Sequence, residues 1–307
     1  MRIHANNISL QSMLLTVATV ACANDTVPPP GSGTSSNETA QSTSTGSNDS
    51  TTGTAGGSAG ETTGMLTDTT GGANSTSAAE PCTEVHRGSL YVLEDTDLST
   101  FKNLGHVTES LYIRMGDRPQ SDLSFLGCLH TVDGAIRIKG NTYLESTAGL
   151  VNVTTLGGLI VLENMSLRTI TGFDKIQETS LVQVSRNPLL DKIEFDSLKW
   201  ADYIQIGECA GMEAAADQAS LMNISGFSGV SRVTRLHVEG NEALTSADIL
   251  DVLIQNGDPM PLEHARFRYN PLLPEADVNE KLSMMGAVDT EVCGNKEGSL
   301  GCICLVG

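Results

Sequence analysis

The chain has 307 residues and a formal net charge of −19, because 37 Asp and Glu outweigh 18 Lys and Arg. Nucleic acids and anionic membrane surfaces are bound through basic patches, so this charge argues against both as partners. Aromatic residues make up only 4% of the chain, which is also poor for stacking single-stranded bases. The acidic composition is consistent with an exported protein whose net negative charge keeps it in solution.

The amino-terminal residues have the pattern of an export signal. The apolar run from Met13 to Ala21 is much too short for a membrane-spanning helix of roughly 20 apolar residues. A short apolar core that ends in small residues is typical of a secretory signal peptide, which we expect over residues 1–21. Cys22 follows directly, and the segment around it resembles the lipobox of bacterial lipoproteins, in which the cysteine is acylated. The alternative is an ordinary signal peptide with a cysteine near its cleavage site by chance.

Residues 22–80 are expected to form a disordered tether. Ser, Thr and Gly dominate this stretch, which has almost no large apolar side chains and cannot bury enough surface to offset its ordering entropy. Its r.m.s. reach is roughly 40 Å, from about 5–6 Å times the square root of its length. Acylation at Cys22 implies a membrane as partner through the lipid anchor, and a place in the cell envelope, at the outer membrane or the cell surface. Residues 81–307 are enough for one domain with its own core.

Six further cysteines are candidates for disulfide bonds, because an even number of them in an exported chain favours a disulfide framework. Fifteen pairings are open, and two cysteines one residue apart, Cys302 and Cys304, are expected to have different partners. A metal site is the competing interpretation, but no histidine lies at ligand spacing, so we expect no metal and no cofactor. The six are Cys82, Cys128, Cys209, Cys293, Cys302 and Cys304.

A pattern of two apolar residues two positions apart recurs along the domain. This alternation is the period of a β-strand, and through Ile206 the pairs follow one another at intervals of about 21 to 25 residues, the range of leucine-rich and β-solenoid repeats. Each short coil buries its apolar face only by stacking on its neighbours. The pairs are Leu90/Val92, Leu111/Ile113, Ile136/Ile138, Leu159/Val161, Val182/Val184, Ile204/Ile206, Leu236/Val238 and Ala265/Phe267.

Asparagines occupy the turn that follows five of these strands. An asparagine that points inward there hydrogen-bonds the backbone of neighbouring coils, which supplies partners for turn groups that are otherwise buried and unsatisfied. In the coil that ends at Ile206, Cys209 stands at this position. We therefore expect an asparagine ladder of Asn141, Asn164, Asn187, Asn241 and Asn270.

Two coils are longer than the others and predict helices. The insert Met212–Met222 has the composition of a short helix, and Thr245 to Asp248 matches a capping box that opens a helix ending near Gly257. Pro274 is expected to start a last helix near the carboxyl end. These elements predict a mainly β domain, a right-handed single-stranded β-helix or leucine-rich-repeat-like solenoid of about eight short coils with a few short capping helices.

The segment from Cys82 to Cys304 resembles the receptor L-domain family. The residues that carry the resemblance include Gly134-Ala-Ile-Arg-Ile-Lys-Gly-Asn141, Gly158-Leu-Ile-Val-Leu-Glu-Asn164 and Val182-Gln-Val-Ser-Arg-Asn187. The resemblance implies a right-handed β-helix, and in receptors such domains bind protein ligands. Together with the lipobox it suggests a bacterial surface lipoprotein, of the kind known from myxobacteria.

The outward strand positions form the candidate binding face. They hold mixed polar side chains and no pair of carboxylates, which a glycosidase requires. His237 alternates with inward residues and is expected to project into solvent. The Glu94, Asp95 and Asp97 cluster lacks the spacing of a calcium loop. The candidate face consists of Tyr112, Arg137, Gln183, Gln205, His237 and Arg266.

No catalytic pattern is present in the sequence: the histidines are scattered, and nucleophile elbows, zinc helix motifs and phosphate loops are lacking. We therefore expect a non-enzymatic surface protein that binds a protein or glycan ligand. The alternatives are a structural or adhesive envelope protein without a discrete ligand and, third, a carbohydrate-active β-helix enzyme.

Overall fold

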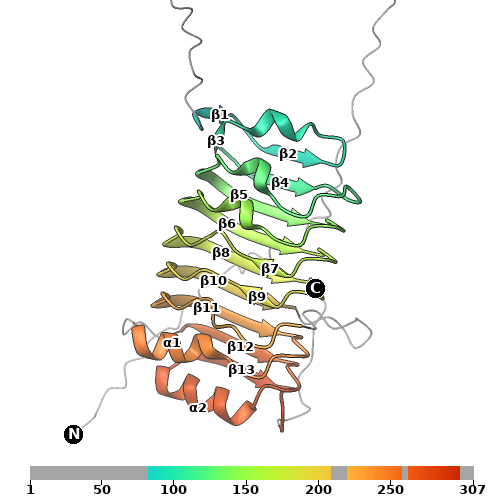
Figure 1. Cartoon of the computed structure of the whole chain (residues 1–307). Coiled ribbons are helices and arrows are strands. Elements are labelled where there is room, and N and C mark those ends of the chain that lie inside the picture. Colours follow the sequence, from blue (N-terminus) through green and yellow to red (C-terminus); the bar gives the residue numbers. More distant parts are fainter. Residues whose placement is uncertain (1–81, 209–219, 258–261, 298–307) are drawn as a thin grey trace, which may run out of the picture. The chain divides into compact units, whose positions relative to one another are not determined.

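A computed structural model describes residues 82–208, 220–257 and 262–297, which all belong to one compact unit (Figure 1). The expected signal peptide, the tether and Cys22 lie outside the described residues, as do Cys209, Cys302 and Cys304. Most of the expected helix at Met212–Met222 also lies outside them; its last three residues, Ser220 to Met222, are described and are not helical.

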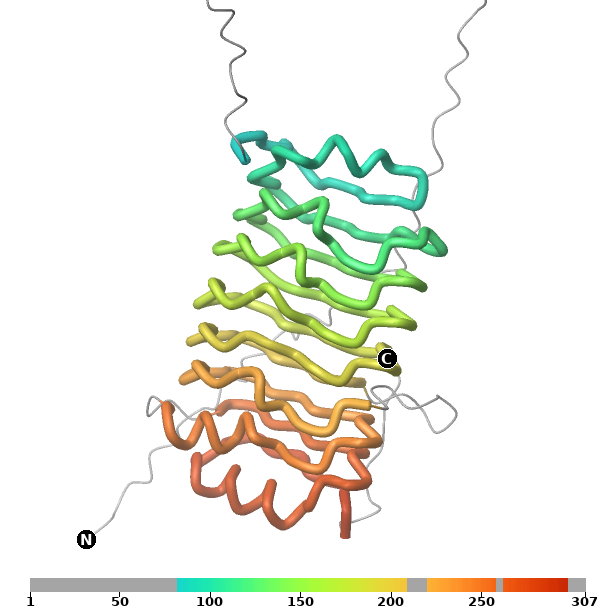
Figure 2. Tube along the Cα trace, viewed as in Figure 1, coloured from blue at the N-terminus to red at the C-terminus, as the bar shows by residue number. Residues whose placement is uncertain are grey.

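The unit is built on one parallel sheet of eleven strands, so the expected mainly β class is confirmed. From β5 onward, strands that follow one another in this sheet are also neighbours in it, whereas β1 pairs with β3 and β2 pairs with β4. The stacked order is visible from the blue to the red end of Figure 2. The strands are β1 (Glu84–His86), β2 (Leu90–Leu93), β3 (Leu104–Val107), β4 (Leu111–Arg114), β5 (Thr131–Lys139), β6 (Thr155–Leu162), β8 (Glu178–Ser185), β10 (Trp200–Gly207), β11 (Arg232–Glu239), β12 (His264–Arg268) and β13 (Asp289–Cys293).

All eight predicted apolar pairs lie on strands of this sheet. Leu111, Ile136 and Leu159 are register partners on adjacent strands, and this row continues through Val182 to Ala265. Its members are fully buried, because alternate residues of a strand point to the same face of the sheet. The core therefore consists of stacked rows of aliphatic side chains, each contributed by a different strand.

The connections between strands form the other walls of the core. Parallel neighbours require each connection to bring the chain back to the starting end of the strand. Short 3-10 helices lie on this return path, together with a two-stranded sheet. These elements are η1 (Leu98–Phe101), η2 (Ser124–Leu126), η3 (Ala148–Leu150), β7 (Thr169–Ile170) and β9 (Lys192–Ile193). Phe173, Phe195 and Phe227 stack nearly parallel inside this wall, with ring centres 5.0 and 5.5 Å apart.

Two α-helices lie beside the last strands (Figure 1), α1 (Asp248–Asn256) and α2 (Glu275–Met285). The predicted capping box is wrong: the residue before α1 is Ala247, which has no capping side chain, and Thr245 Oγ1 instead donates to the carbonyl of Met222. Proline 274 precedes α2, as expected. Lys281 joins the helices by an ion pair of 2.9 Å with Asp251.

The five asparagines of the predicted ladder are all buried, each in the turn that follows its strand. Nδ2 of Asn141 donates to Oδ1 of Asn164, whose Nδ2 in turn donates to Oδ1 of Asn187. Each Nδ2 also reaches the carbonyl of a residue on the preceding strand, as from Asn164 to Ile138 at 3.0 Å. A second run joins Asn241, Asn270 and Asn295, the last of which the sequence analysis missed.

The ladder is interrupted between its two runs. Among the described residues, Oδ1 of Asn241 is buried and has no hydrogen-bond partner, whereas Oδ1 of Asn164 and of Asn270 each accept two bonds. The interruption falls in the coil where Cys209 replaces asparagine in the sequence.

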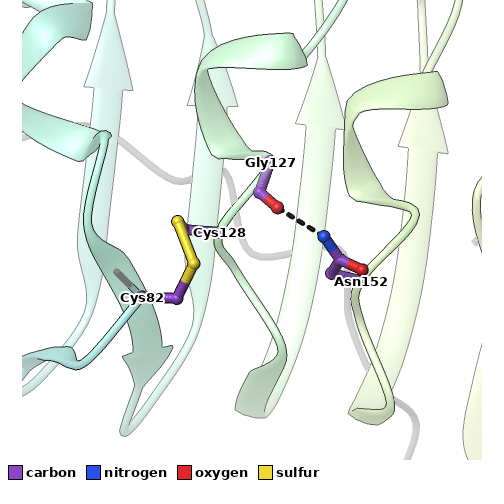
Figure 3. Close-up of a disulfide and its surroundings, with 4 residues drawn as sticks. All are labelled: Cys82, Gly127, Cys128 and Asn152. Carbon is purple, nitrogen blue, oxygen red and sulfur yellow. Dashed lines mark hydrogen bonds between the residues drawn. A yellow bond between two sulfur atoms is a disulfide. The ribbon is translucent and has the colours of Figure 1, made fainter. Parts of the chain in front are cut away.

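A disulfide bond joins Cys82 to Cys128 across 46 residues, and closes the first coil onto the turn after η2 (Figure 3). Beside it, Nδ2 of Asn152 donates to the carbonyl of Gly127. Cys293 is disulfide-bonded as well. Of the helices in the described residues, none is long and apolar enough to span a bilayer.

We expect the double replacement Cys82→Ser with Cys128→Ser to lower the free energy of unfolding by about 4 kcal/mol, because the cross-link removes closure entropy from a loop of this length in the unfolded chain. Urea titration followed by circular dichroism measures the change. Full stability in the double variant would show that the bond contributes nothing to the fold.

Candidate functional site: the outer face of the sheet

The six residues of the candidate face lie in one continuous row. Each is the register partner of the next along the sheet, and the row also includes three residues outside the predicted set: Tyr91, Ile160 and Glu291. We call it the outer row: Tyr91, Tyr112, Arg137, Ile160, Gln183, Gln205, His237, Arg266 and Glu291. The strands thus place side chains that lie 200 residues apart in sequence on a single line.

The first end of the outer row is aromatic. Tyr91 and Tyr112 stack with ring centres 4.6 Å apart and planes 10° from parallel, and the guanidinium of Arg137 lies 5.6 Å from the centre of the Tyr112 ring. Nε of Arg137 is buried and has no hydrogen-bond partner in the part of the chain that the structure describes. Stacking of this kind stiffens side chains that otherwise sample many rotamers.

Next to the aromatic end, the outer row has one apolar position, Ile160. Ile160 is only 7% exposed. Ala135, Gly158 and Leu181 lie beside it as register partners two residues earlier on their strands. This zone therefore separates the aromatic end of the face from its polar end.

The polar end surrounds His237. Tyr203 and Arg235 are register partners, and each lies two residues before a member of the outer row on its strand. The guanidinium of Arg235 is 4.9 Å from the centre of the Tyr203 ring, and Nη2 of Arg235 is 2.5 Å from Oδ2 of Asp202. The sequence analysis missed these residues, although they occupy the alternate outward positions of strands that it had identified.

His237 does not project into solvent, contrary to expectation. Its side chain is 13% exposed, because Tyr203 meets its ring edge-on with centres 4.9 Å apart and the Tyr203 hydroxyl lies 2.8 Å from Nδ1. Burial, together with the positive charges of Arg266, Arg268 and Arg235, lowers the pKa of His237 to about 3. The imidazole is therefore neutral at ordinary pH. Burial also raises the pKa of Tyr203 to about 12, and the negative charge of Glu239 adds to this shift.

A buried neutral histidine makes the fold sensitive to acid. The unfolded chain binds a proton at His237 below about pH 6.5, whereas the folded chain does so only near pH 3. The contribution of His237 to the free energy of unfolding is therefore complete above pH 6.5 and is lost as the pH falls from 6.5 towards 3. At pH 4.5 this loss is about 2–3 kcal/mol for the single group. We expect His237→Gln to lose less stability between pH 7 and 4.5 than the parent chain. Urea titrations at both pH values measure the difference, and equal losses would contradict the assignment.

The arginines of the polar end differ in their partners. Arg268 is 12% exposed and pairs with Glu239 at 2.9 Å and with Glu291 at 3.2 Å. Arg266 is 44% exposed, and its Nε lies 3.6 Å from the same carboxylate of Glu291. Within the described residues, the two terminal nitrogens of Arg266 make no hydrogen bond. Arg266 therefore presents its guanidinium fork to the outside.

A small pocket of about 190 Å³ lies away from this face, beside β9. Asp191, Glu194 and Asp196 line it, and two of these carboxylates have partners: Nζ of Lys192 is 2.5 Å from Glu194, and Ser228 Oγ donates to Asp196 at 2.8 Å. A pocket lined by carboxylates is a candidate for acid–base chemistry.

The acidic residues near the first coil have a structural role. Oδ1 of Asp97 accepts a hydrogen bond from the backbone N–H of Ser99 and caps η1, and this bonding to Ser99 lowers the pKa of Asp97. Among the residues that the structure describes, no three His, Cys, Asp or Glu gather as a metal site. Comparisons of the chain with protein-family models, with curated proteins and with solved structures found no match.

Proposed function

We propose that this chain is a non-enzymatic, lipid-anchored surface protein that presents the outer face of its sheet to a protein or glycan ligand. The observation that carries the proposal is the outer row, a line of mostly aromatic and polar side chains that runs from β2 to β13 with one apolar residue, Ile160. Exposed aromatic and arginine side chains on a rigid surface are the residue types that dominate recognition interfaces.

The architecture in this proposal is a right-handed β-helix of the receptor L-domain type. Three features support it: all neighbouring strands of the main sheet are parallel, the strands up to β10 recur at intervals of about 21 to 25 residues, and asparagines line the turns. Crossovers between parallel strands of one sheet are almost always right-handed. Such a scaffold holds the outer row fixed, which limits the entropy lost when a ligand binds.

A photo-crosslinker distinguishes this face from the rest of the surface. Benzoylphenylalanine at Gln183, in the middle of the outer row, is expected to form a discrete crosslinked species on intact cells. The matched control carries it at Val151, which is 48% exposed and follows η3 on the opposite wall. Crosslinking from Val151 but not from Gln183 would refute binding by the outer face.

Alanine replacements test the same interface by function. Tyr112→Ala, Arg137→Ala and Arg266→Ala together are expected to abolish the species captured at Gln183, because they remove the stacked aromatic and two guanidinium groups. Capture that is unchanged in the triple variant would contradict the proposal.

The lipid anchor is tested separately. We expect a fatty-acid probe to label the full chain in a bacterial host and to leave Cys22→Ala unlabelled, because the thiol of Cys22 is the proposed acylation site. Labelling of the variant would overturn the assignment, whereas absence of label from the parent chain would favour the ordinary signal peptide.

The pocket beside β9 favours one alternative, a carbohydrate-active enzyme. Its carboxylates Asp191, Glu194 and Asp196 are the chemical groups that glycosidic cleavage uses. Release of reducing ends from a polysaccharide panel by the parent chain, and its loss in Glu194→Gln, would favour this alternative over binding. A structural or adhesive role without a discrete ligand is instead favoured if neither face is crosslinked.

A further inference from the structure

We propose that the ligand of the outer face is an extended peptide segment with acidic residues at both ends and apolar residues between them. This inference rests on the proposed binding function and specifies its partner. It follows from three properties of the face: its local charge, the exposed guanidinium of Arg266, and the apolar zone beside Arg137.

The local charge of the outer face is opposite to that of the whole chain. The outer row and the positions two residues to either side of it carry more cations than anions, on a protein whose net charge is −19. Binding partners carry charges complementary to the surface that they contact, so a basic patch on an acidic protein favours a ligand with a local acidic segment. The cations are Arg114, Arg137, Lys139, Arg235, Arg266 and Arg268, and the anions are Glu239, Asp289 and Glu291.

At the polar end, Arg266 is the group that a carboxylate would contact. Its fork is exposed, and the nearest carboxylate, Glu291, is shared with Arg268. Two parallel N–H bonds from one guanidinium to one carboxylate are a strong and directional pairing. The neutral imidazole of His237 lies beside this position as the register partner of Arg266.

The second cationic position is at the aromatic end. Arg137 is packed against Tyr112, which holds its guanidinium in place. Five strand-to-strand steps separate β5 from β12 in the sheet, a distance of roughly 24 Å at about 4.8 Å per step. An extended peptide covers this span with about seven residues.

The apolar zone lies between these two positions. A segment that contacts Arg137 and Arg266 must pass over Ile160 and Leu181, where polar side chains would lose water without gaining partners. Apolar residues are therefore favoured in the part of the segment that follows its contact with Arg137, before it reaches Gln183 and Gln205. A glycan has hydroxyl groups along its length, so this zone favours a peptide.

The probe is a synthetic peptide, Glu-Glu-Gly-Leu-Ala-Leu-Gly-Glu-Glu, acetylated, amidated and labelled with a fluorophore. We expect saturable binding to the folded chain by fluorescence anisotropy. The same peptide with glutamine in place of every glutamate is expected to bind at least tenfold more weakly, because the charge-assisted bonds are lost. Absence of binding by the glutamate peptide, or equal binding of both, overturns the inference.

Variants locate the contacts. Arg266→Gln and Arg137→Gln are each expected to weaken binding of the glutamate peptide about tenfold. The matched control is Arg232→Gln, which removes the same charge from an exposed residue of β11 outside the outer face and is expected to leave affinity unchanged. If Arg232→Gln and Arg266→Gln weaken peptide binding equally, the effect comes from the net charge of the protein, and the proposed binding site is contradicted. Thermal unfolding of each variant verifies that the fold is retained.

Competition by polygalacturonate tests the choice of a peptide over an acidic glycan. If polygalacturonate displaces the probe at equal carboxylate concentration, the outer face binds polyanions in general, and the inference that its ligand is a peptide is overturned. The outcomes also separate this inference from the proposed function: crosslinking at Gln183 without binding of the glutamate peptide refutes only the acidic segment. Peptide binding without crosslinking on cells refutes the function.

Discussion

Asn164→Leu is expected to lower the free energy of unfolding by about 4 kcal/mol, since it removes the central amide of the first ladder run. The variant leaves the buried backbone N–H of Asn141 without its acceptor and the carbonyl of Ile138 without its donor. Each buried group without a partner costs about 1–3 kcal/mol. Leucine has a similar volume, so the effect reports lost hydrogen bonds and not a cavity. Urea titration followed by circular dichroism measures the change.

The matched control for this replacement is Asn152→Leu. Asn152 also donates from Nδ2 to a backbone carbonyl, that of Gly127 at 2.7 Å, but its side chain is exposed (Figure 3). Water replaces the lost partner there, and we expect a change below about 1 kcal/mol. Similar losses in both variants would show that burial of the ladder does not matter.

Phe195→Ala is expected to cost about 4 kcal/mol and to weaken the cooperativity of unfolding. Its ring is fully buried between those of Phe173 and Phe227, so its removal leaves a cavity and interrupts the aromatic stack. Each coil of a repeat array is stabilised by its neighbours, and a weak interface in the middle allows the two parts to unfold separately. A second transition in the urea curve would report this separation.

The control for this variant is Phe195→Leu, which keeps most of the buried volume. We expect it to cost about 1–2 kcal/mol and to retain a single transition. If Phe195→Ala unfolds in one step with the midpoint of the parent chain, the stack does not stabilise the wall between neighbouring coils.

The main strands were predictable because large aliphatic residues occupy their inward positions. The first halves of β5 to β11 were not, because the buried positions do not alternate there: Ala201 and Ile204 are both buried although they are three residues apart, as are Val233 and Leu236. The last strand, β13, was missed for a different reason. Its residues in register with the buried row are Thr290 and Val292, and Thr290 is polar and exposed. Alternation therefore predicts a strand only where the buried residues keep a spacing of two and no polar residue stands among them.

The residues of the candidate face were predictable from the sequence, but their burial and their contacts were not. Alternation placed His237 on the outward side, and register confirms that side. Its burial depends on Tyr203 and Arg266, whose strands lie about 30 residues away in either direction. The length of the inserts fixes which residues of these strands become neighbours, and this cannot be read from any single strand.

The asparagine ladder has an electrostatic consequence. In each run the side-chain amides are aligned head to tail, with Nδ2 directed toward the next coil and Oδ1 toward the previous one. Aligned amide dipoles polarise one another, so each bond in a run strengthens the next. The dipole of the first run begins at Asn141, whose Oδ1 accepts the backbone N–H of Met115, whereas Oδ1 of Asn241, where the second run begins, has no donor among the described residues. The described ladder therefore consists of two blocks with parallel dipoles, divided at the coil that contains Cys209 in the sequence.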